Sequence, residues 1–100
     1  MSILRSWVYE VSDRLNADKR LRSSVKDPSP NHSNSGYVID IEGSSAIAQF
    51  IAWPSLGYES TVLDSASGDC VYIDSGSVSD LGQLYECWDR FVATLQKFEP

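Results

Sequence analysis

The chain has 100 residues, a net charge of −6 and 42% hydrophobic residues, which suits one domain with a single packed core. The acidic balance argues against binding to nucleic acid or to an anionic membrane surface, because both require a basic footprint. It suits a basic protein partner, since opposite charges steer association. An acidity that serves only solubility is the alternative.

The N-terminus does not resemble a secretory signal, because Arg5 and Glu10 interrupt its apolar residues. No apolar run reaches transmembrane length. We therefore expect a cytoplasmic protein in which Cys70 and Cys87 stay reduced. Two cysteines and one histidine are too few for a zinc site, and we expect no metal and no cofactor.

Residues 1–22 are predicted to form an N-terminal helix. Ile3, Trp7, Val11 and Leu15 follow the spacing of one helix face. Residues 23–36 contain two prolines among several Ser and Asn residues. We therefore expect an exposed linker without regular structure in this segment.

Residues 37–75 predict a β-meander of four strands. Between the first two strands, Gly43-Ser44 fits a two-residue hairpin turn that places Glu42 opposite Ser45. Side chains alternate between the two faces of a strand, so this turn decides which residues share a face. The side that we expect to pack on helices holds Tyr37, Ile39, Ile41, Ala46, Ala48, Phe50 and Ala52. The outward side holds Val38, Asp40, Glu42, Ile47, Gln49, Ile51 and Trp53.

The third and fourth strands are less constrained by the sequence. A four-residue loop over 54–57 pairs Trp53 with Tyr58 and places both aromatic side chains on the outward face. For the fourth strand, an odd loop with a bulge buries Val71 and Ile73 and leaves Tyr72 and Asp74 outside. An even loop does the reverse. We favour the odd loop because it buries two β-branched residues.

Residues 77–98 are predicted to form the C-terminal helix. Ser77 and Asp80 have the spacing of a capping box. Apolar residues from Leu81 to Phe98 recur at helical spacing, which indicates a core-facing stripe. The predicted fold is therefore α+β in the order αββββα within one domain of residues 1–100, with both helices on one sheet face. One helix on each face is the alternative.

The sequence offers little catalytic chemistry. Asp40, Glu42, Asp64 and Asp74 are the only carboxylates worth considering as an acid–base pair. The chain has no nucleophile elbow and no glycine-rich phosphate loop. We therefore expect a binding protein and not an enzyme.

The order of these elements resembles a known family of small proteins. The stretches LRSWVYEVSDRL, YVIDIE, IAQFIAW, ESTVLDSASGD and CVYID are similar to those of immunity proteins from bacterial polymorphic toxin systems, most closely the TriTu family. This resemblance implies an inhibitor used in interbacterial competition. It would bind a cognate ADP-ribosyltransferase toxin that modifies elongation factor Tu, and would occlude the toxin's active site. The NAD cofactor would belong to the toxin.

We therefore expect a one-to-one complex with a basic toxin, with Trp53 and Tyr58 as aromatic anchors. A secretion chaperone or adaptor is the alternative, and it would bind an effector without blocking its activity. A small enzyme and a homodimer through the outward face are further alternatives. The expected partner-binding residues are Glu42, Ile51, Trp53, Tyr58, Glu59, Asp64, Asp69, Tyr72 and Asp74.

Overall fold

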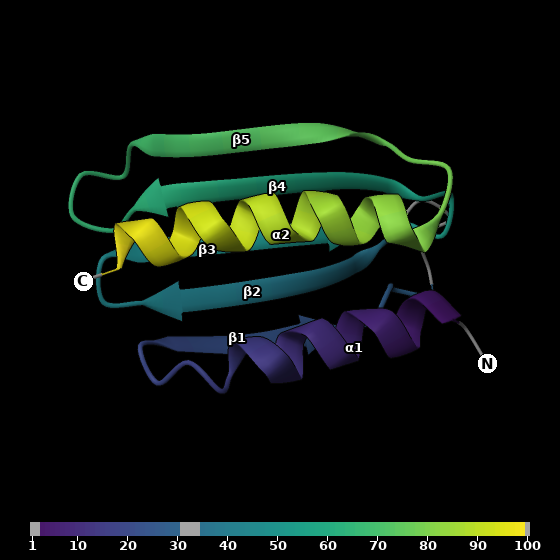
Figure 1. Ribbon diagram of the computed structural model, residues 1–100, viewed down its shortest axis with the longest axis horizontal. Coiled ribbons are helices and arrows are strands. Elements are labelled where there is room, and N and C mark those ends of the chain that lie inside the picture. Colours follow the sequence, from purple (N-terminus) through teal and green to yellow (C-terminus); the bar gives the residue numbers. More distant parts are fainter. Residues whose placement is uncertain (1–2, 31–34, 100) are drawn as a thin grey trace.

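The computed structural model describes residues 3–30 and 35–99, in which two helices flank an antiparallel sheet (Figure 1). Each strand pairs with its neighbours in the sequence, from β1 to β5. The predicted α+β class is confirmed, but the described sheet has five strands and not four. The elements are α1 (Ile3–Leu15), β1 (Leu21–Lys26), β2 (Tyr37–Gly43), β3 (Ala46–Ala52), β4 (Gly57–Asp64), β5 (Cys70–Ser77) and α2 (Leu81–Phe98).

The additional strand, β1, occupies the end of the predicted N-terminal helix and the start of the predicted linker. α1 ends at Leu15 and not near residue 22, because the backbone turns back and Leu21 N–H donates to the Asp18 carbonyl (3.0 Å). Leu21 is buried and Ser23 and Val25 are half-buried, whereas the alternate residues Arg22, Ser24 and Lys26 are exposed. This period-two pattern is typical of a strand with one covered face. Residues 31–34 of the predicted linker lie outside the described residues.

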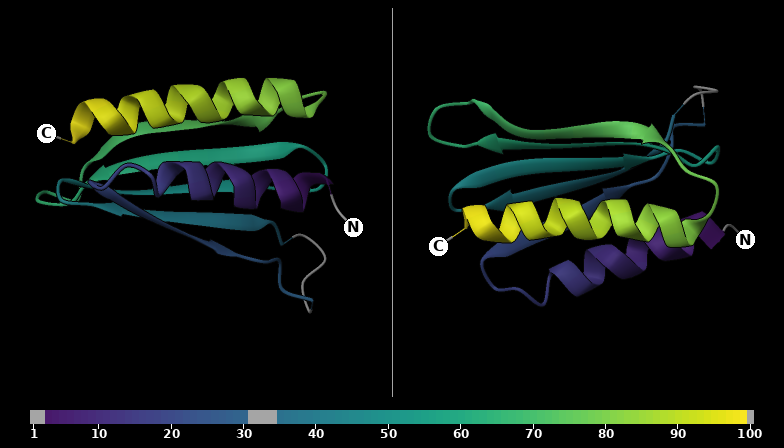
Figure 2. Two further views of the ribbon diagram at one scale, coloured as in Figure 1. Left: turned by 60° about the horizontal axis from the view of Figure 1, so that its bottom comes forward. Right: turned by 45° about the horizontal axis from the view of Figure 1, so that its top comes forward.

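Both helices lie on the same face of the sheet (Figure 2). α1 packs over β1 and β2, and α2 packs over β3 and β4. The alternative of one helix on each face is therefore wrong. We call the helix-covered side the packed face and the other side the open face.

The hairpin between β2 and β3 keeps the predicted faces but not the predicted register. Glu42 pairs with Ile47 and not with Ser45, so the register is shifted by two residues. A shift of two preserves the face of every side chain, whereas a shift of one would exchange the faces. Ile39, Ile41 and Phe50 accordingly lie on the packed face, where each is almost fully buried.

The hairpin between β3 and β4 reverses the predicted faces of β4. Trp53 N–H donates to the Gly57 carbonyl (3.0 Å), and Leu56 N–H donates to the Trp53 carbonyl (2.8 Å). The loop therefore has three residues, and the last, Leu56, has a positive φ of 69°, as three-residue hairpin loops require. Tyr58 consequently pairs with Ala52 and not with Trp53, and its side chain enters the core.

The fourth predicted strand, β5, is reversed as a consequence. Ile73 pairs with Thr61 on the open face, and Tyr72 pairs with Val62 on the packed face. The bulge predicted near this hairpin is present between Val62 and Leu63. The preferred burial of Val71 and Ile73 is therefore wrong, because the face of β5 follows that of β4.

The core is centred on Phe50, which is fully buried. Its ring stacks on Tyr58 at 6.0 Å and meets Trp88 edge-on at 5.2 Å. Trp7 of α1 and Phe91 of α2 complete this cluster, with ring centroids 6.2 and 5.5 Å from Phe50. Offset and edge-to-face pairs of this kind add to the stability gained by burial.

The second helix begins at Leu81, with Asp80 and not Ser77 as its N-cap. The Asp80 side chain accepts from Gln83 N–H (2.9 Å), and the Gln83 side chain accepts from Ser79 N–H (2.9 Å). This reciprocal arrangement resembles a capping box displaced by three residues from the predicted one. Among the described residues, no helix is long and apolar enough to cross a membrane.

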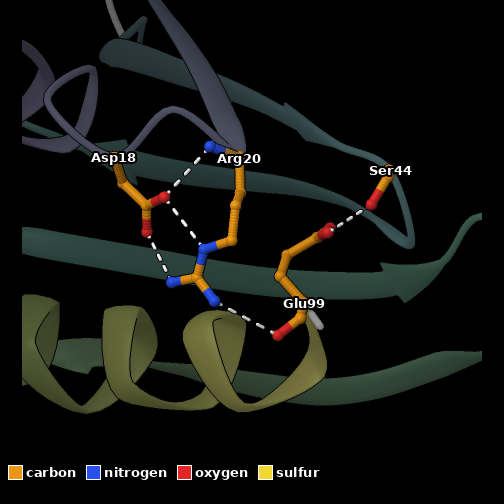
Figure 3. A network of polar contacts seen from close by, with 4 residues as sticks. All are labelled: Asp18, Arg20, Ser44 and Glu99. Carbon is orange, nitrogen blue, oxygen red and sulfur yellow. Dashed lines mark hydrogen bonds and ion pairs between the residues drawn. The ribbon is translucent and has the colours of Figure 1, made fainter.

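Residues just after the two helices are tied together by a polar network (Figure 3). The buried Glu99 carboxylate accepts from the Ser44 hydroxyl (2.8 Å) and from the N–H groups of Ser45 and Ala46 (both 3.0 Å). Arg20 binds Asp18 through two side-chain nitrogens (2.9 and 2.7 Å) and donates to the Glu99 carbonyl (3.3 Å). Glu99 thus fixes the β2–β3 turn, and Arg20 joins it to the end of α1.

The same contacts lower the pKa of both carboxylates, Asp18 and Glu99. The side-chain and backbone hydrogen bonds from Arg20 lower the pKa of Asp18 to about 2. Burial alone would raise the pKa of Glu99, but the hydrogen bonds from Ser45, Ser44 and Ala46 outweigh burial and lower it. Both groups are therefore charged at neutral pH.

Candidate functional site: the open face of the sheet

The open face is an uncovered surface built by all five strands. The register places its side chains in three rows that run across the sheet. The first row is Arg22, Glu42, Ile47 and Leu63. The second is Ser24, Asp40, Gln49, Thr61 and Ile73. The third is Lys26, Val38, Ile51, Glu59 and Ser75.

Exposed aliphatic side chains lie on the central strand β3 and on the edge strand β5 of this surface. Ile47 is 51% exposed and Ile73 is 67% exposed. Two shallow hollows, of about 470 and 220 Å³, adjoin Ile47 and also share Asp40 and Ala48. Because monomeric proteins seldom expose several aliphatic residues together, such a surface is typical of a protein-binding site.

The charges of the open face are paired at its β1–β2 end. Arg22 lies 3.8 Å from Glu42, and Lys26 lies 3.4 Å from Asp40. Among the described residues, Glu59 on β4 has no ion-pair partner. The carboxylates of Glu42 and Asp40 are therefore neutralised by ion pairs with β1. The Glu59 carboxylate, which has no such pair among the described residues, lies nearer the β5 edge.

Four of the predicted partner-binding residues lie on or beside this face. Glu42, Ile51 and Glu59 belong to its rows. Trp53 follows them at the end of β3 and is half-buried. A Cβ atom on Gly36 would lie 3.0 Å from the Trp53 ring, so this glycine leaves space for the indole.

Three others lie on the packed face, where the prediction had not placed them. Tyr58 is only 7% exposed, and its hydroxyl donates to Asp74 (2.9 Å). Asp74 also lies 3.6 Å from Arg90 of α2. Tyr72 is half-buried against the core. These residues hold the β4–β5 hairpin against α2 and are not part of the open face.

The remaining two predicted residues are Asp64, which ends β4, and Asp69, which lies in the β4–β5 connection. The Asp64 side chain accepts from Ala66 N–H (2.9 Å), which supports the turn. Asp69 is exposed, and its N–H donates to the Ser67 hydroxyl (3.2 Å). Asp69 therefore remains accessible to a partner at the edge of the sheet, whereas Asp64 has a local structural contact.

The surroundings of Tyr58 raise the pKa of its phenol well above the usual value. The first cause is the hydrogen bond with the Cys87 thiol, followed by burial and by the bond to Asp74. The Cys87 thiol also accepts from Arg90 (3.4 Å). Cys87 is buried and Cys70 is exposed, and both are free thiols. The phenol is thus neutral and structural at ordinary pH.

Sequence reasoning missed several contributors to the open face, among them Thr61 and Leu63, which the predicted four-residue loop places on the packed face. Arg22 and Lys26 were not included because Arg22 was assigned to the N-terminal helix and Lys26 to the linker, although Leu21 and Val25 alternate with polar residues in this segment. Ile73 was assigned to the core because β-branched residues usually are buried in strands. The positive φ of Leu56, which reverses β4 and β5, has no obvious signal in the sequence.

The carboxylates considered as an acid–base pair contact neighbouring groups of the protein. Asp40 is bound by Lys26 and accepts from the Gln49 amide (3.1 Å). Within residues 3–30 and 35–99, no group of three His, Cys, Asp or Glu side chains could hold a metal ion. The open face offers aliphatic contact, ion pairing and hydrogen bonding to a partner.

Comparison with known protein families gives a match over most of the chain. A family model described as immunity protein TriTu matches residues 2–94, which include all five strands, α1 and most of α2. A search among curated proteins finds no match. The matched residues thus include every row of the open face.

Proposed function

Because the chain belongs to the TriTu family of immunity proteins, we propose that it neutralises a cognate bacterial toxin by binding it through the open face. The family supports the toxin-neutralising role, and the location of the binding surface is our inference. The observation behind it is the uncovered sheet, whose exposed Ile47 and Ile73 lie among charged side chains.

The toxin in this proposal is an ADP-ribosyltransferase domain with a basic surface. The immunity protein binds it one-to-one in the cytoplasm of the producing cell and covers its active site. The inhibitor supplies no cofactor, because the NAD is a substrate of the toxin. Support comes from the net charge of −6, which favours rapid association with a basic partner.

The test is a pair of substitutions that change the net charge equally. Ile47→Arg places a charge at the centre of the open face, next to both hollows. Ala93→Arg places the same charge on the exposed side of α2. Because a charged side chain buried in an apolar contact without a partner costs several kcal/mol, Ile47→Arg should weaken the complex by at least about a hundredfold.

The measurements are survival of cells that produce the cognate toxin, and ADP-ribosyl transfer by the purified toxin domain. We expect Ala93→Arg to protect and inhibit like the wild type, and Ile47→Arg to fail in both assays. Equal protection by both variants would reject the open face as the interface. A toxin that binds the wild-type protein but stays active would instead indicate an adaptor.

A further inference from the structure

The two outer edges of the sheet differ in how their backbone groups are satisfied. On β1, the Ser23 N–H donates to the Asn16 side-chain oxygen (2.7 Å), and the Ser23 carbonyl accepts from the Asn16 amide (3.1 Å). Leu21 N–H donates to the Asp18 carbonyl (3.0 Å). The turn after α1 therefore occupies the positions at which another strand would pair with β1.

The outward groups of β5 follow from its ladder with β4. Val78 N–H donates to the Leu56 carbonyl (3.0 Å), and antiparallel pairs alternate between hydrogen-bonded and non-hydrogen-bonded types. The backbone groups of Asp74 therefore face β4, whereas those of Ile73 and Ser75 point away from the sheet. Within the described residues, these outward groups have no hydrogen-bond partner.

β5 has a bulge near its start, but it lacks three other features that usually protect an edge strand. Short length, Lys or Pro prevents such an edge from pairing, but β5 has eight residues and contains neither Lys nor Pro. Ile73 and Val71 are 67% and 43% exposed beside this edge. Among the segments drawn in colour, none lies along the outer side of β5 (Figure 1).

The charge of the protein is concentrated in the half that contains this edge. Residues 1–50 have six basic and six acidic side chains, whereas residues 51–100 have two basic and eight acidic ones. The whole net charge of −6 therefore belongs to the half that forms β4, β5 and α2. A segment that adds to β5 approaches the most negative part of the molecule, and Lys or Arg side chains suit it.

We propose that an extended segment of the toxin adds to β5 as a sixth strand of the sheet. Its backbone pairs with the outward N–H and C=O groups of Ile73 and Ser75. Its apolar side chains lie beside Val71 and Ile73, and its Lys and Arg residues meet the surrounding acids. This inference rests on the proposed function, because it describes how the same toxin extends its contact from the open face around the edge.

A second copy of the chain is the competing occupant of β5. Pairing of β5 with itself would bring together the two halves that each have a net charge of −6, and like charges oppose such a contact. The same negative charge attracts a basic toxin segment. The charge distribution therefore favours the toxin over self-association.

Two substitutions at one position isolate the outward amide. Ser75→Pro removes the N–H that the added strand needs, and proline is tolerated where an edge N–H faces solvent. Ser75→Ala removes the hydroxyl and keeps the N–H. Affinity for the purified toxin domain is measured by calorimetry, with thermal unfolding as the check on folding. We expect Ser75→Pro to weaken binding at least about tenfold more than Ser75→Ala, since it loses a hydrogen bond and its ring obstructs the pairing strand.

Hydrogen exchange in the wild-type protein gives an independent measurement, in case Ser75→Pro does not fold. The amides of Ile73 and Ser75 should exchange rapidly in the free protein and become protected in the toxin complex. Rapid exchange of both amides in a complex that Ile47→Arg disrupts would reject the sixth strand and leave the proposed function standing. Protection in the free protein, with a dimeric mass by light scattering, would assign the edge to a second copy. Absence of any complex with the toxin would reject both proposals.

Discussion

The packed face and the open face are made by alternate residues of the same strands, yet they differ in almost every property. On β3, Phe50 is fully buried among four other aromatic rings. Ile47, three residues earlier, is half exposed beside charged side chains. The residues of the packed face are in close contact with the helices. On the open face, aliphatic side chains stay exposed beside ion-paired charged groups.

This difference shows how a small domain can separate stability from recognition. Because strand side chains alternate, a substitution at one position affects one face and leaves its neighbour on the other face in place. The separation is directly testable, because residues on the packed face should govern unfolding and residues on the open face should govern binding.

The largest expected effect is on the packed face. Phe50→Ala should lower the free energy of unfolding by about 4 kcal/mol, because a large cavity remains at the centre of the aromatic cluster. Ile47→Ala, on the same strand but on the open face, should change it by less than about 1 kcal/mol. Urea unfolding followed by tryptophan fluorescence measures both values. Comparable losses for the two variants would mean that the open face is covered in solution.

An intermediate effect is expected for Trp53, at the border of the open face. Trp53→Ala should weaken the toxin complex by about 2 kcal/mol, because aromatic residues dominate binding energy at interfaces. The indole also lies against Gly36, so some loss of stability accompanies this change. Calorimetric titration of the folded variant separates the two effects. An unchanged affinity would restrict Trp53 to a structural role.

The smallest expected effect is that of the Tyr58 hydroxyl. Tyr58→Phe should lower the free energy of unfolding by about 1 kcal/mol, because Asp74 and Cys87 lose a partner, and it should leave toxin binding unaltered. The pKa of Tyr58 is raised on folding, so the neutral phenol stabilises the fold fully below the ordinary phenol pKa of about 10. This stabilisation declines as the pH rises above that value. The stability difference between the wild type and Tyr58→Phe should therefore shrink at alkaline pH. A constant difference from pH 8 to pH 11 would contradict this assignment.

The sequence was sufficient to predict both helices, the meander and the faces of β2 and β3. The periodic apolar residues of α2 and the alternation in Tyr37–Gly43 reflect burial, and burial is the dominant energy in folding. The two-residue error in the first hairpin had no consequence for the faces, because an even shift conserves them.

The faces of β4 and β5 were beyond prediction for a specific reason. They depend on whether the loop after Trp53 has three or four residues, and this is decided by Leu56 in a backbone conformation that favours glycine. Glycine is the residue that usually adopts a positive φ, so the sequence points to Gly57 for this position of the turn. In the structure the preceding residue, Leu56, adopts it. β1 was missed because Ser23 and Ser24 have no strong strand preference. Its pairing with β2 and the Asn16 contacts, which are tertiary, stabilise it.

The contact between Glu99 and the β2–β3 turn has a consequence for synthesis of the chain. Every strand pairs with the strand made just before it, so the sheet can assemble progressively as the chain is translated. Ser44 and Glu99 are separated by 55 residues, so the N–H groups of Ser45 and Ala46 can bind this carboxylate only after residue 99 has been made. A chain that stops before residue 99 therefore has all its strands but leaves this turn unfinished.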